Sequence, residues 1–157
     1  MTPSRGSPSA DLIERLERAT GEDRELNARI WWCVERTRAE RAYWNAAGGL
    51  PRALPDVFPT NGLGTIAIAM FAPNYSGSLD AAVSLVPEGW SWSVTYESEK
   101  KSSPAFCGSV RRYWTSFDKD HFAFAVSPAI ALCIASLRAR AANVGEDVGA
   151  LVRLRGN

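Results

Sequence analysis

The order of apolar and polar residues in the first third of the chain has a helical period. Apolar side chains recur every three or four positions over residues 12–19, with charged side chains between them. This spacing predicts a first helix that ends at Thr20-Gly21. A second helical pattern runs from Asp23, whose side chain can cap it, to about Ala47. We therefore expect two helices here, of which the second is long.

The next segment changes character twice. It first carries Pro51, Pro55 and Pro59, which cannot continue a helix and which predict an extended connector. Residues 62–71 are then apolar and uncharged, and isoleucines alternate with small residues. This alternation predicts a strand.

The pattern over residues 78–142 predicts a helix, two strands and a final helix. Ser78 can cap the first of these helices. Residues 90–96 alternate large apolar with hydroxyl side chains, and residues 106–113 return as a partner strand. Ser127, followed by a proline, marks the start of the last helix. We therefore expect an α+β fold in which a small antiparallel sheet is layered between helices.

A chain of 157 residues is typical of one domain. We expect a disordered tail over residues 1–8 and a single α+β domain over residues 9–142, elaborated over residues 33–73. Residues 143–157 contain three glycines and are expected to form a C-terminal tail.

Charge and hydropathy exclude some partners. The net charge is +1, and glutamates interleave with the arginines of the 23–47 helix, which argues against binding to duplex nucleic acid. The apolar and uncharged run over residues 122–137 has 16 residues, and it is too short to cross a membrane. Three cysteines suit a reducing compartment, so we expect the cytoplasm of a bacterial host cell.

The residues give little support for an enzyme. His121 is the only histidine, and a general base would need an orienting partner such as Asp118 or Asp120. A solvated loop histidine is the more usual role. Neither a nucleophile elbow nor a phosphate-binding glycine loop occurs, and the cysteines lack metal-ligand spacing. We expect no catalysis, no cofactor and no metal site.

Aromatic and arginine residues gather at one end of the predicted strand pair. Arginine matches phosphate geometry, and aromatic faces stack on bases. Arg111 and Arg112 are neighbours and must point to opposite faces of their strand. The alternative is an aromatic cluster in the core with arginines at a strand end. The candidate ligand-binding residues are Tyr75, Ser76, Trp90, Trp92, Arg111, Arg112 and Trp114.

The predicted 23–47 helix carries more aromatic residues than one inward stripe requires. Trp31, Tyr43 and Trp44 are therefore candidates for an interface, where such residues are enriched. The alternative is packing against residues 50–71 of the same chain. Since aromatic residues of this helix are expected to be exposed, we expect a homo-oligomer that associates through it.

Three segments resemble the phage ABA sandwich family, whose members are small and mostly uncharacterised phage and prophage proteins. Residues 75–90 look like the central motif, residues 127–140 like the closing helix, and residues 24–30 like the opening helix. The resemblance covers about half the chain and departs from the family pattern over residues 32–73. It implies a layered helix–sheet–helix fold and a phage origin, but no catalytic residues.

These observations lead to two functional expectations. The first is a non-catalytic phage-encoded protein that counters host antiviral defence by sequestering a nucleotide-like immune signal. The second is a protein-binding inhibitor or adaptor that acts on a host protein through the 23–47 helix.

Overall fold

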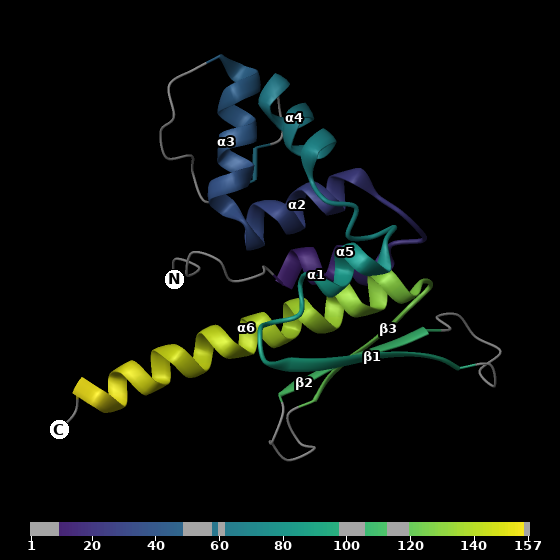
Figure 1. Cartoon of the computed structure of the whole chain (residues 1–157), viewed down its shortest axis with the longest axis vertical. Coiled ribbons are helices and arrows are strands. Elements are labelled where there is room, and N and C mark those ends of the chain that lie inside the picture. Colours follow the sequence, from purple (N-terminus) through teal and green to yellow (C-terminus); the bar gives the residue numbers. More distant parts are fainter. Residues whose placement is uncertain (1–9, 49–57, 60–61, 98–105, 113–119, 156–157) are drawn as a thin grey trace.

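The computed structural model describes residues 10–48, 58–59, 62–97, 106–112 and 120–155 (Figure 1). Six helices and three strands follow one another along these residues. In chain order they are α1 (Ala10–Arg18), α2 (Arg24–Val34), α3 (Arg36–Ala47), α4 (Leu63–Phe71), α5 (Leu79–Val83), β1 (Trp90–Tyr96), β2 (Phe106–Arg112), β3 (His121–Ala125) and α6 (Pro128–Arg155).

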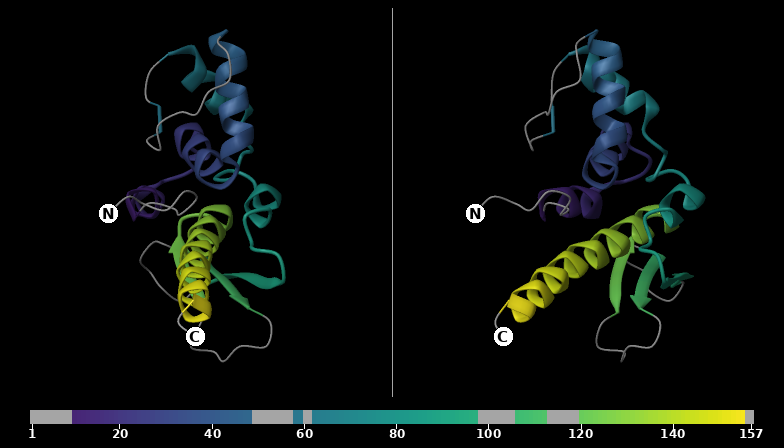
Figure 2. Two further views of the ribbon diagram at one scale, coloured as in Figure 1. Left: turned by 90° about the vertical axis from the view of Figure 1, so that its left-hand side faces the viewer. Right: turned by 60° about the vertical axis from the view of Figure 1, so that its left-hand side comes forward.

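Helix α6 is the middle layer of the molecule. The antiparallel sheet, in the order β1-β2-β3, packs against one side of α6, and α1 and α5 pack against the other (Figures 1 and 2). The residues of α6 from Ala129 to Leu137 are all buried, as a helix covered on both sides requires. The α+β class and the small antiparallel sheet are thus confirmed, but the sheet is an outer layer rather than the central one.

Small side chains bring the sheet close to α6. The face of the sheet toward α6 carries Val110, Ala123 and Ala125, which are buried. Gly108 lies on the same face, because it pairs with Ala123 in the register of β2 and β3. A side chain larger than these would hold the helix and the sheet apart, so this face sets the position of both.

Several boundaries agree with the sequence patterns. Asp23 caps α2, where its carboxylate accepts from the backbone N–H groups of Glu25 and Leu26, and Ser78 caps α5 in the same manner. Strand β1 spans Trp90–Tyr96 and pairs with β2, which begins at Phe106. Helix α6 begins at Pro128, as expected, but it continues to Arg155. Residues 143–155 are therefore helical, where an irregular tail was expected.

The strand predicted over residues 62–71 is wrong, because this segment forms helix α4. Gly64, Ala67 and Ile68 are buried, which is a helical spacing. The alternation of isoleucine with alanine imitated the period of a strand. The small residues at 64 and 67 instead allow α4 to pack closely against the neighbouring helices α2 and α3.

The long helix predicted over residues 23–47 is also wrong, because it is broken at Glu35. This residue has φ −123° and ψ 55°, outside the helical region, and it separates α2 from α3. The break turns α3 away from the core so that it pairs with α4, and these two helices project from the rest of the molecule (Figure 1). Strand β3 was missed, since its five residues directly precede a strong helix start.

Candidate binding surfaces

Two of the predicted ligand-binding residues lie in the interior. Tyr75 is fully buried, and the Cys133 thiol donates to its backbone carbonyl oxygen over 3.2 Å. Burial raises the pKa of the Tyr75 hydroxyl above its ordinary value, and the nearby Glu35 carboxylate adds to this shift. Ser76 is also buried. Neither residue offers a surface to a ligand in this conformation.

Ser76 belongs instead to a network of hydrogen bonds between the start of α2 and the turn that follows α4. The Asn27 side-chain oxygen accepts from the Ser76 backbone N–H over 2.7 Å, and the Asn27 amide nitrogen donates to Asn74 over 3.0 Å. The Ser76 hydroxyl oxygen accepts from the Asp23 backbone N–H over 2.9 Å. Since Asn27 and Ser76 are both buried, the bond between them is shielded from water, and the three bonds together hold the two segments in contact.

The structure brings Trp90 and Arg112 together at one end of the sheet. They are paired in the register of β1 and β2, and the Arg112 guanidinium carbon lies 5.2 Å from the centre of the Trp90 ring. The His121 ring centre lies 5.9 Å from that of Trp90, and Arg112 donates to the side-chain oxygen of Asn143. We call these four half-buried residues the Trp90 cluster.

The other predicted residues do not all join the Trp90 cluster. Trp92 lies on the same face of β1, where it pairs with Val110 and stays 42% exposed. Arg111 pairs with Ser91 and therefore points to the opposite face of the sheet, as the alternation of a strand requires. Trp114 lies outside the described residues.

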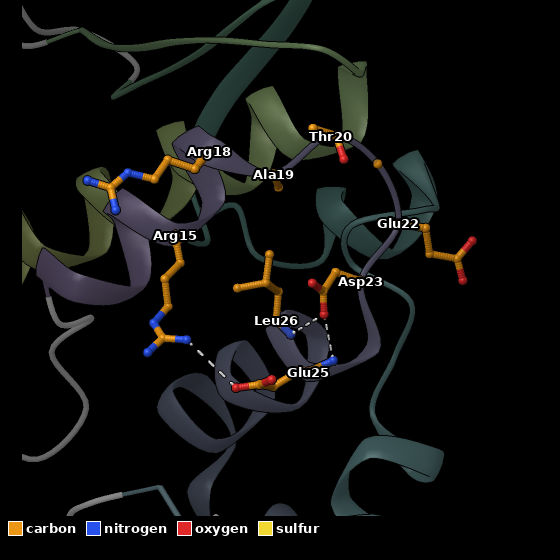
Figure 3. Close-up of a pocket in the computed structure, with 9 residues that line it drawn as sticks. Arg15, Arg18, Ala19, Thr20, Glu22, Asp23, Glu25 and Leu26 are labelled. Atoms are coloured by element: carbon orange, nitrogen blue, oxygen red, sulfur yellow. Dashed lines mark hydrogen bonds and ion pairs between the residues drawn. The ribbon is translucent and has the colours of Figure 1, made fainter.

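A hollow of about 390 Å³ lies elsewhere, between α1 and the start of α2 (Figure 3). Four of its charged side chains, those of Arg15, Arg18, Asp23 and Glu25, already have partners. Asp23 caps α2, and Arg15 makes an ion pair with Glu25 over 3.8 Å. Arg18 pairs with Glu14 at the rim. The hollow therefore indicates no particular ligand.

The candidate interface residues of the 23–47 segment are largely occupied by their own chain. Trp31 is only 5% exposed, so its assignment to an exposed interface is wrong. Tyr43 and Trp44 are half-buried and pack edge to face, with ring centres 5.1 Å apart. The Tyr43 ring also lies directly against Gly64 of α4. Tyr43 thus packs against the 50–71 segment of its own chain, which was the alternative interpretation.

The large exposed apolar side chains of the projecting part lie on α4 instead. Leu63, Ile66, Met70 and Phe71 are 69%, 56%, 66% and 68% exposed. The first three recur at helical spacing and form one stripe, while Phe71 ends the helix. We call these four residues the α4 face. The helical spacing of Leu63, Ile66 and Met70 is visible in the sequence. The strand interpretation missed it, because in a strand these residues lie on two different faces.

Two of the cysteines have raised thiol pKa values. Burial raises the pKa of the Cys33 thiol to about 11 and that of Cys133 to about 12, which makes both thiols poor nucleophiles. The part of the chain that the structure describes holds no group of three His, Cys, Asp or Glu side chains that could share a metal ion. None of the described helices combines the length and apolar character needed to cross a membrane.

Comparisons with protein-family models, with curated proteins and with solved structures find no match for this chain. The resemblance to phage ABA sandwich proteins therefore rests on the residues quoted for it alone.

Proposed function

We propose that this protein is a non-catalytic binding protein that contacts another protein through the α4 face. The observation that carries the proposal is the exposure of four large apolar side chains on one nine-residue helix. Burying one such side chain contributes about 1.5–3 kcal/mol. Leaving all four in water forgoes that stabilisation, and exposed apolar patches of this kind mark interaction sites.

The packing of α4 supports the proposal, since a docking helix must be held in place by its own chain. Gly64 lets the Tyr43 ring approach the α4 backbone, and Ile68 is fully buried on the inner side. Leu63, Ile66 and Met70 remain directed outward at the spacing with which a helix fits an apolar groove. The proposal leaves the identity of the partner protein open, and the phage resemblance alone favours a host protein.

The test is a photo-activated cross-linker placed at position 66, with position 95 on β1 as the control. Thr95 is exposed but lies on the sheet, away from α4. We expect a cross-linked protein complex of fixed stoichiometry from position 66 and none from position 95. Ile66→Asp should abolish the complex without changing the circular dichroism spectrum. Equal products from both positions, or none from position 66, would contradict the proposal.

The Trp90 cluster favours a second candidate function, the capture of a small nucleotide-like ligand. The Arg112 guanidinium, which lies over the Trp90 ring, is a phosphate partner, and the indole is an aromatic surface for stacking. That the ligand is a signal of host antiviral defence is an expectation that rests on the phage resemblance.

Arg111 is a natural control for this second candidate, because it lies on the opposite face of the same strand. Native mass spectrometry with mono-, di- and cyclic dinucleotides would measure binding. Arg112→Ala should abolish it and Arg111→Ala should leave it unchanged. Loss of binding in both variants, or in neither, would contradict the assignment of the site.

A further inference from the structure

We propose that the partner at the α4 face is a second copy of this chain. Two copies pair their α4 helices antiparallel about a two-fold axis that passes close to Ile66. This inference rests on the proposed function, since it names the partner of the same surface. The evidence comes from the charge, the geometry and the area of the α4 face.

The absence of charge suits an interface between identical surfaces. In a two-fold pair the same patch meets itself, so a charged side chain close to the axis would face its own copy and repel it. Residues 62–71 contain no Asp, Glu, Lys or Arg, and the next charge along the chain is Asp80. On the neighbouring helix α3, Arg36 and Glu40 already pair with each other over 2.6 Å. Helix α4 itself can therefore meet its own copy without like-charge contact.

The positions of the exposed residues fit an antiparallel pairing. Ile66 stands next to Ala67, the middle residue of α4, so it lies closest to a two-fold axis that crosses the helix. Leu63 at one end then meets Met70 of the second copy at the other end. A helix of nine residues is about 13 Å long, so the stripe spans the whole contact.

The exposed area sets the expected strength of the dimer. From their exposed fractions, the four side chains expose roughly 500 Å² in each copy, so two faces together bury at most about 1,000 Å², the lower limit for a specific interface. An interface of this small size is typical of a weak and reversible dimer.

Sedimentation velocity with opposite charges at position 66 tests the inference. We expect the wild-type protein to shift from monomer to dimer between low micromolar and several hundred micromolar concentration. Ile66→Asp and Ile66→Lys should each stay monomeric, because each places like charges at the axis. An equal mixture of the two variants should dimerise again, because a carboxylate from one copy then meets an ammonium group from the other. Thr95→Asp and Thr95→Lys are the matched controls and should dimerise like the wild type.

Three results would overturn the inference. A wild-type monomer at several hundred micromolar would exclude the dimer, and a dimer that survives Ile66→Asp would exclude the α4 face. Monomeric variants that do not recombine would exclude pairing of position 66 with itself. If the protein is monomeric but cross-links to a different protein from position 66, the proposed function stands and only this inference fails. Binding of wild-type monomer, but not Ile66→Asp, to phosphatidylcholine vesicles would contradict both.

Discussion

A Cβ atom added to Gly108 would lie 2.6 Å from the carbonyl carbon of Ala131, so β2 meets α6 backbone to backbone. Real Cβ atoms do not approach other atoms so closely, and a backbone group cannot swing aside as a side chain can. We therefore expect Gly108→Ala to separate the sheet from α6 and to lower the free energy of unfolding by about 1–3 kcal/mol.

Gly21→Ala is the matched control for this substitution, because a Cβ atom at Gly21 meets nothing within 4 Å. Urea denaturation followed by circular dichroism would measure both variants. We expect the Gly21 variant to unfold close to the wild-type midpoint. Equal midpoints for the two variants would show that the contact between β2 and α6 is looser than described.

The hydrogen bonds of the Asn27 side chain lead to a second prediction. Asn27→Ala leaves the buried Ser76 N–H without its acceptor and removes the bond to Asn74. A buried polar group without a partner costs about 1–3 kcal/mol, and we expect a loss of that size in urea denaturation. Asn45→Ala on the exposed surface of α3 should change the free energy of unfolding by less than about 0.5 kcal/mol. A loss of less than about 0.5 kcal/mol for Asn27→Ala would argue against these hydrogen bonds.

The cap of α2 leads to a third prediction. The Asp23 carboxylate accepts from Glu25 N–H over 2.8 Å and from Leu26 N–H over 3.1 Å. Asp23→Ala should therefore cost about 0.5–2 kcal/mol, measured as a lower thermal midpoint. Glu88→Ala, an exposed carboxylate in a turn, should leave the midpoint nearly unchanged. If both variants melt alike, the cap contributes nothing.

Buried thiols and a buried hydroxyl lead to a fourth prediction, on alkaline stability. Burial raises the pKa of Cys33 from 9.0 to about 11, with the Arg140 and Arg36 charges opposing the shift. Between these two values the unfolded chain has lost the thiol proton while the folded chain keeps it. Stability is therefore full below pH 9 and falls as the pH rises toward 11, by up to about 1.4 kcal/mol per pH unit for one group.

Denaturation midpoints at several pH values between 8 and 11 would measure this fall. Cys133 and Tyr75 shift in the same direction, so Cys33→Ala should reduce the slope without removing it. A midpoint that rises with pH would contradict the sign of these shifts.

The sequence predicted elements well where local signals decide them. Asp23, Ser78 and Ser127 mark helix starts through their own side chains, and the alternation over Trp90–Tyr96 is a property of that strand alone. Helix α4 was misread because its small residues face Tyr43 on another helix, and this contact has no trace in the local pattern. The break at Glu35 was missed because the charged pairs on both sides of it are typical of helix.

The candidate site was predicted only in part, for a similar reason. The pairing of Trp90 with Arg112 follows from strand register, which the two patterns allowed. The burial of Tyr75 and Trp31 depends on elements distant in the chain, such as α6 for Tyr75. The exposure of Ile66 likewise depends on which side of α4 the helices α2 and α3 cover. The periodicity of the sequence does not reveal that.

The central place of α6 has a consequence for how the chain matures on the ribosome. The sheet, α1 and α5 all pack against α6, yet all of them precede it in the chain. Leu16, Ala82 and Val110 therefore have no cover until residues 129–139 have left the exit tunnel, when the core can close. Nascent chains stalled before Pro128 should consequently remain sensitive to protease and bind chaperones, whereas chains released from the ribosome should not.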